Sequence, residues 1–231
     1  MGTKNGIADS SCKSFVTHIT KLTVKERKMT EKEQIRRSVT DRSRLPELFP
    51  THGHSPEFWE QLGRTVATFG FLEEVLEKAF FAFTATKSYD PEEVEAAYKA
   101  WLPKLEKALT DQLWILAESY GKAVRENQDS TIENINELVE DLKEATKIRN
   151  VLCHGSWRTP DADGKSLPLF INKANKKFET AIDVNYLRQV QVHVVGLACS
   201  VIDTVTHMGW QFPGGAGPGE TIWPTPIPYL S

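Results

Sequence analysis

The residues best suited to chemistry lie in the segment 147–157, which reads Lys-Ile-Arg-Asn-Val-Leu-Cys-His-Gly-Ser-Trp. Arg149 carries a planar guanidinium that matches phosphate oxygens, and His154 carries an imidazole that moves protons near neutral pH. Asn150 and His154 are four residues apart, so on a helix they lie one above the other at its last turn. The three side chains can therefore border one pocket without sharing one helix face.

Arg149 occupies an unusual position for a cation. Apolar residues recur along 131–154 at heptad-like steps, and Arg149 falls at one of these positions. Because a buried ion without a partner is costly, either Glu73 or another carboxylate pairs with it, or the position is an anion site. A purely structural explanation also exists. Arg149 and His154 before Gly155 are typical of any helix end, where cations favour the negative end of the dipole and Gly accepts a left-handed cap.

Four predicted helices must position these residues. The first covers 55–86, because Ser-Pro-Glu is a helix-start pattern and apolar residues then follow at steps of three and four. The second covers 90–120, with a kink or restart at Pro103. The third covers 131–154. The last begins near Asp183, and its wide apolar face predicts a central, mostly buried position.

Between the third and the last helix the hydrophobic period changes. Residues 156–159, 167–173 and 178–181 are predicted to form two or three short antiparallel strands. Polar turns at 161–164 and 174–177 separate them. The sequence therefore predicts a mainly helical domain with a small sheet before its last helix.

The order Arg-Asn-x-x-x-His at a helix end, followed by Gly and an aromatic residue, resembles the motif of the HEPN family (higher eukaryote and prokaryote nucleotide-binding). The resemblance also covers the order of elements over residues 55–210. It implies a mainly α fold, a four-to-five-helix up-and-down bundle with a small antiparallel β-hairpin insert before the last helix. HEPN domains usually form homodimers with their motif helices facing each other, and many are metal-independent endoribonucleases.

By position, the resemblance makes Arg149, Asn150 and His154 the catalytic residues. In such a reaction the RNA 2′-hydroxyl attacks the adjacent phosphate, so His154 would move protons and Arg149 would stabilise charge on phosphorus. Asn150 would orient the imidazole or the phosphate, and Glu73 would support Arg149. One chain offers one such histidine, whereas cleavage ordinarily uses an acid and a base, so a twofold dimer would place two His154 side chains in one cleft. Trp157 is a supporting candidate that either stacks a base or packs the hairpin on the bundle.

The formal net charge of −3 is unevenly distributed. Residues 1–45 hold 11 Lys or Arg against 5 Asp or Glu, whereas residues 46–231 hold 17 against 26. We expect a basic, disordered arm over 1–54, a HEPN-like helical domain over 55–210 and an extended Pro/Gly-rich tail over 211–231. The arm either attracts phosphate backbones or is a solvated extension. The acidic body argues against RNA binding.

Composition indicates the cellular compartment in which the protein is expected. No run approaches the roughly 20 apolar residues that span a bilayer, and the amino terminus lacks the pattern of a secretory signal. Cys12, Cys153 and Cys199 are widely spaced, which is typical of reduced thiols. We therefore expect a cytoplasmic protein with no membrane partner. His52 and His54 could supply two metal ligands, but no pattern completes a site, so we expect neither a metal nor another cofactor.

Three functional hypotheses follow. The first is a HEPN-type endoribonuclease, a toxin or antiviral effector, whose partners are RNA, a second copy of the chain and an antitoxin or other regulatory protein. The second is a non-catalytic HEPN-like helical dimer that binds a nucleotide or a protein, with Arg149 paired internally. The third is a structural bundle without a ligand, which requires Arg149 to be neutralised by Glu73 and His154 either to be exposed or merely to cap the helix.

Overall fold

The structure is a computed structural model that describes residues 38–87 and 89–215. Most of the predicted basic arm and of the predicted Pro/Gly-rich tail lies outside the described residues. The chain divides into two units, residues 1–45 and 46–231. The described part of the first unit contains a short 3-10 helix, η1 (Arg42–Arg44). The candidate site belongs to the second unit.

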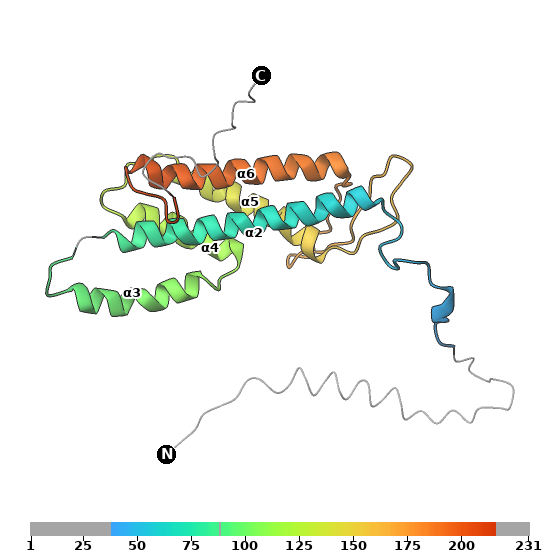
Figure 1. Ribbon diagram of the computed structural model, residues 1–231, viewed down its shortest axis with the longest axis horizontal. Coiled ribbons are helices and arrows are strands. Elements are labelled where there is room, and N and C mark those ends of the chain that lie inside the picture. The colour runs from blue at the N-terminus through green and yellow to red at the C-terminus, as the bar shows by residue number, and fades with distance from the viewer. Residues whose placement is uncertain (1–37, 88, 216–231) are drawn as a thin grey trace, which may run out of the picture. The chain divides into compact units, whose positions relative to one another are not determined.

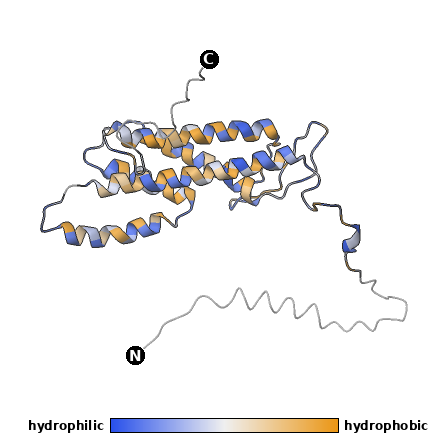
Figure 2. Ribbon diagram, in the orientation of Figure 1, coloured by the Kyte–Doolittle hydropathy of each residue, from blue (hydrophilic) through white to orange (hydrophobic). Residues whose placement is uncertain are grey.

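The second unit is mainly helical (Figure 1). Its described part contains α2 (Pro56–Ala85), α3 (Val94–Ala108), α4 (Leu113–Glu126), α5 (Ile135–His154) and α6 (Val184–His207). α2 packs against the four other helices, and α5 also packs against α4 and α6. Figure 2 shows apolar and polar residues interleaved along each helix, the pattern of a helix with one buried face. The buried side chains of α2, α4, α5 and α6 form one core.

α2 begins at the predicted start signal. The Ser55 hydroxyl accepts a hydrogen bond from the Phe58 amide over 3.2 Å, and Pro56 is the first helical residue. The predicted apolar stripe is buried, including Phe58, Leu62, Phe69, Leu72, Leu76 and Phe83. This stripe makes α2 the helix around which the others pack.

α6 also begins where predicted, since the Asp183 carboxylate accepts a hydrogen bond from the Tyr186 amide over 2.7 Å. Leu187 and Val194 are fully buried, but Val192 on the opposite side is 75% exposed. The predicted mostly buried position is therefore wrong for one side of α6, because the neighbouring helices cover only the other. Among the described residues, α6 alone is long and apolar enough to cross a membrane, a test that core helices of soluble proteins also pass.

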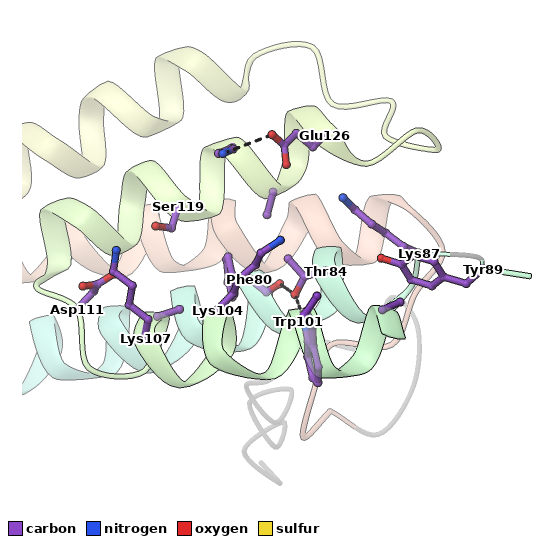
Figure 3. Close-up of a pocket in the computed structure, with 15 residues that line it drawn as sticks. Phe80, Thr84, Lys87, Tyr89, Trp101, Lys104, Lys107, Asp111, Ser119 and Glu126 are labelled. Atoms are coloured by element: carbon purple, nitrogen blue, oxygen red, sulfur yellow. Dashed lines mark hydrogen bonds and ion pairs between the residues drawn. The ribbon is translucent and has the colours of Figure 1, made fainter. Parts of the chain in front are cut away.

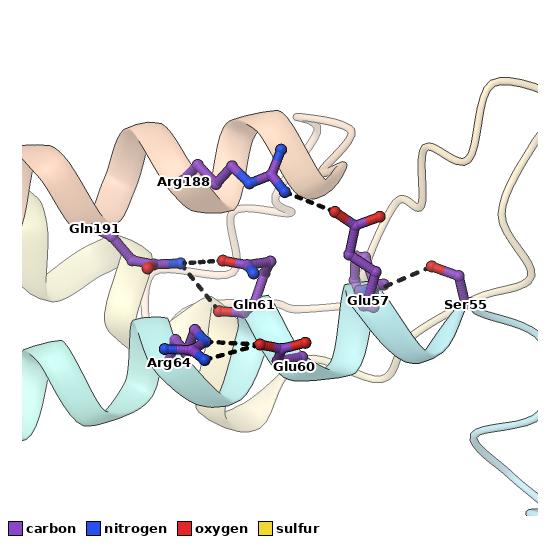
Figure 4. Close-up of polar contacts among 8 residues, drawn as sticks. Ser55, Glu57, Glu60, Gln61, Arg64, Arg188 and Gln191 are labelled. Carbon is purple, nitrogen blue, oxygen red and sulfur yellow. Dashed lines mark hydrogen bonds and ion pairs between the residues drawn. The ribbon is translucent and has the colours of Figure 1, made fainter.

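Polar contacts align the first turns of α2 and α6 (Figure 4). Gln191 Nε2 donates to the Gln61 carbonyl over 3.2 Å and to the Thr65 hydroxyl over 3.1 Å. Arg188 pairs with Glu57 at 2.6 Å. Because these contacts join the starts of both helices, α2 and α6 run in the same direction.

The second predicted helix is two helices. Pro103 lies inside α3, and the break comes later, before α4 starts at Leu113. In the connection, the Thr110 hydroxyl donates to a carbonyl in the last turn of α3 over 3.1 Å, a local bond that competes with helix continuation. α4 buries Leu113 in the core, whereas α3 buries only Ala108. The segment therefore forms two helices with different surroundings: α4 packs in the core, and α3 lies mostly outside it.

No β-strand forms among residues 38–87 and 89–215, so the predicted hairpin is not present as strands. Three isolated antiparallel bridges hold the segment between α5 and α6 instead, and they join Ser156 to Leu169, Ser166 to Ile182 and Ile171 to Lys177. Pro160 and Pro168 have no amide proton to donate, which interrupts continuous pairing. We refer to residues 156–182 as the connecting segment.

Candidate functional site

Arg149 lies on the side of α5 that faces α2. Its Nη2 is 3.1 Å from Glu73 Oε1, and the two side chains are 30% and 27% exposed. A cation on this apolar stripe was expected either to pair with a carboxylate or to form an anion site. The structure shows the first, an ion pair with a carboxylate of α2. A guanidinium has five N–H donors, so this contact leaves donors for a second anion. The partial exposure of the Arg149 and Glu73 side chains gives such an anion access from solvent.

Asn150 lines a different feature, a groove of about 430 Å³ between α5 and the connecting segment. α5 contributes Lys147, Ile148 and Val151 as well as Asn150. The connecting segment contributes Phe170, Asn172, Lys176, Lys177 and Phe178, and α6 contributes His193. The groove therefore combines cationic, amide and aromatic groups. We call it the α5 groove.

The α5 groove is locally basic although the unit as a whole is acidic. Lys147 is ion-paired with Glu144, which also lines the groove. Within the described part of the chain, no ion pair engages the side chain of Lys176 or Lys177. Lysine ammonium groups bind phosphates. The partly buried rings of Phe170 and Phe178 beside them are of the kind that stacks bases.

His154 is the last residue of α5, and it is exposed to solvent. The helix ends there because the Gly155 amide donates to the Val151 carbonyl over 2.8 Å while the Gly155 backbone is extended. A Cβ atom at Gly155 would lie 2.6 Å from the Val151 oxygen and 3.0 Å from Pro168 Cβ. Glycine is therefore required at this helix end by close packing, not by a left-handed backbone.

Trp157 packs in an aromatic cluster at the start of α2. Its ring centroid lies 5.0 Å from that of Phe58, 6.2 Å from that of His54 and 6.5 Å from that of Trp59. Burial lowers the pKa of His54. His54 Nε2 is buried and has no hydrogen-bond partner in the part of the chain that the structure describes. The cluster anchors the connecting segment directly after the motif.

The three predicted catalytic residues have different surroundings. Arg149 contacts α2, Asn150 lines the α5 groove and His154 faces solvent. No hydrogen bond or ion pair between described residues joins one of the three side chains to another. A single chain therefore does not bring the three side chains together. A catalytic site that uses all three requires a surface from a second molecule.

The α5 groove contains residues outside the predicted motif. Lys176, Lys177 and Phe178 are contiguous in the sequence, and two lysines beside an aromatic residue were the available signal. Nothing in the sequence alone indicated that they would line one groove with Asn150. Comparison of the chain with protein-family models, with curated proteins and with solved structures finds no match.

Proposed function

We propose that this chain is a metal-independent endoribonuclease of the HEPN type that acts as a homodimer, in the role of a toxin or antiviral effector. Arg149, Asn150 and His154 are its catalytic residues. The observation that carries the proposal is that the Arg-Asn-x-x-x-His motif lies at a solvent-accessible helix end, next to a basic groove. The mainly helical fold supports the proposed up-and-down bundle of this family.

In this proposal Glu73 is a positioning residue. A guanidinium that donates two hydrogen bonds to one phosphate must have a fixed orientation. The ion pair with Glu73 of α2 restricts the rotation of the long Arg149 side chain. Arg149 then stabilises the extra negative charge that develops when the 2′-hydroxyl attacks phosphorus. Its partial exposure supports this role because a fully enclosed guanidinium would not reach RNA.

His154 supplies proton transfer, and the dimer supplies the second proton-transfer group. The attack removes a proton from the 2′-hydroxyl and delivers one to the leaving 5′-oxygen. An exposed His154 at the end of α5 suits a twofold interface in which the equivalent residue of a second copy completes the pair. The products would be a 2′,3′-cyclic phosphate and a free 5′-hydroxyl.

The α5 groove is the proposed RNA-binding surface. Lys176 and Lys177 would contact backbone phosphates, and Phe170 and Phe178 would stack bases. This local basic region answers the objection that residues 46–231 hold 26 acidic against 17 basic residues.

A second candidate function is a non-catalytic helical dimer that binds a nucleotide or a protein. The Glu73–Arg149 ion pair favours it, because a paired guanidinium needs no ligand to be stable in this position. The two candidates differ in whether RNA is cut.

The decisive experiment incubates the purified full chain with mixed RNA in EDTA. We expect cleavage to fall about 100-fold or more in Arg149→Ala and in His154→Ala. Arg188→Ala and His207→Ala are matched controls, since Arg188 also pairs with a glutamate of α2 and His207 is also the exposed last residue of a helix. RNA with 2′-O-methyl groups should remain intact. Failure of the wild type to cut, or equal cutting by all variants, contradicts the enzyme. It leaves the second candidate and the structural bundle without a ligand, whose two requirements, an Arg149–Glu73 pair and an exposed His154, are present.

A further inference from the structure

A second cavity lies between α2, α3 and α4, and no residue of α5 lines it (Figure 3). Its volume is about 520 Å³, which is within the range of small-molecule sites. α3 covers one side of the cavity and buries a single residue, Ala108. We call this feature the α3 cavity.

The α3 cavity is unusually rich in cations. Its charged lining consists of Lys87, Lys104, Lys107, Lys122, Asp111 and Glu126. Lys122 is paired with Glu126 at 3.6 Å. The other three lysines, Lys87, Lys104 and Lys107, stand against Asp111, which leaves a formal excess of two positive charges. None of those three is ion-paired with a carboxylate in the described ranges. Because residues 46–231 are acidic overall, this concentration of lysine runs against the composition of the unit.

Three aromatic rings line the same cavity, those of Trp101 on α3, Tyr89 before it and the buried Phe80 of α2. Trp101 is held in place, since its Nε1 donates to the Thr84 hydroxyl of α2 over 2.9 Å. A smaller cavity of about 250 Å³ shares Trp101 and Tyr89 as lining residues. Figure 3 shows Lys104 near the middle of the α3 cavity, with Lys87 and Tyr89 at one end and Lys107 at the other.

We propose that the α3 cavity binds a small phosphorylated compound that carries an aromatic ring, the chemistry of a nucleoside polyphosphate. Lys104 and Lys107 would bind the phosphates, because lysine is a compact point charge suited to them. Trp101 and Tyr89 would contact the planar ring. The inference is independent of the proposed ribonuclease activity, since it concerns other residues and requires no cleavage.

Binding would also change how α3 is held. A ligand between α3 and the α2–α4 pair adds contacts to a helix that has almost no buried side chain of its own. Ligands that bind the folded state raise its stability and slow the local opening of the elements they contact. Amide hydrogen exchange in α3 should therefore slow when the site is occupied.

The test titrates the full chain with ADP by calorimetry, and with adenosine and inorganic pyrophosphate as its two halves. We expect ADP to bind at least about tenfold more tightly than either half. Lys104→Gln with Lys107→Gln should weaken ADP binding about tenfold or more, and Trp101→Leu should weaken it by a similar factor. Tyr89→Leu tests the ring contact at an exposed position where folding is not at risk.

Two matched controls locate the site. Lys99→Gln removes an exposed lysine of α3 that pairs with Glu95 and does not line the cavity. Lys176→Gln removes a lysine of the α5 groove. Lys99→Gln should leave ADP affinity unchanged. Loss of ADP binding in Lys176→Gln, but not in the variants of the α3 cavity, would assign binding to the α5 groove and overturn the inference. It is also overturned if ADP fails to bind at millimolar concentration, or if pyrophosphate binds as tightly as ADP.

Discussion

Arg149 Nη2 lies 3.1 Å from Glu73 Oε1, and this ion pair joins the last turns of the motif helix α5 to the middle of α2. The pair has two consequences that can be separated by experiment. It contributes to the stability of the bundle, and in the proposed enzyme it fixes the direction of the guanidinium.

Glu73→Gln keeps the shape of the side chain and removes its charge. We expect the free energy of unfolding to fall by only about 1 kcal/mol, because both partners are partly solvated and water screens them. RNA cleavage should fall about tenfold because Arg149 is no longer held in one orientation. Denaturant unfolding and cleavage rates are measured together, with Glu57→Gln, the partner of Arg188, as the control. Unchanged cleavage in Glu73→Gln would contradict the positioning role.

Gly155→Ala should destabilise the fold by about 1–3 kcal/mol, because its Cβ would lie 2.6 Å from the Val151 oxygen. Gly196→Ala is the matched control. A Cβ at Gly196, inside α6, meets nothing within 4 Å, so this change should be neutral or stabilising by up to about 1 kcal/mol. Urea unfolding of both variants checks the prediction, and equal effects would show that the packing around Gly155 is not tight.

Stability should decrease as the pH falls below about 6.5, the ordinary pKa of histidine. Burial lowers the pKa of His54 in the folded state, so the unfolded chain takes up a proton first. The stabilising contribution is complete above the unfolded pKa and is lost as the pH falls towards the folded one. His54→Phe keeps an aromatic ring beside Phe58 and should flatten this part of the pH profile. If the pH profile of His54→Phe has the same slope as that of the wild type, the prediction is wrong.

Lys176→Gln combined with Lys177→Gln should weaken RNA binding and reduce its salt dependence. Two fewer phosphate contacts should lower the slope of log affinity against log salt by about 1.4 for single-stranded RNA. Lys165→Gln with Lys173→Gln changes the charge of the same connecting segment equally at exposed positions outside the α5 groove. If both pairs alter the slope by the same amount, the groove has no special role.

Mixing subunits tests the shared site. When wild-type and His154→Ala subunits exchange freely at constant total protein, activity should fall with the square of the wild-type fraction if both histidines are needed in one cleft. A linear decrease would mean that each chain acts alone. Light scattering checks that both proteins form dimers, and a monomeric wild type would contradict the composite site directly.

Much of the helical architecture could be predicted locally. The starts at Ser55 and Asp183 depend on side chains that cap the amides just after them. The buried stripes of α2 and α5 follow from helical periodicity. The break between α3 and α4 could not be predicted in this way, because the apolar spacing continues through it and only the position of the core decides where the chain turns.

The same division applies to the candidate site. The sequence by itself determined that Arg149, Asn150 and His154 lie in the last turns of one helix, because their spacing and the following glycine are local properties. Only the tertiary structure decided that Glu73, among the possibilities for Arg149, is its partner, and that Asn150 lines one groove with Lys176 and Lys177. These contacts join residues far apart in the chain. They depend on how helices and the connecting segment pack, which no local pattern encodes.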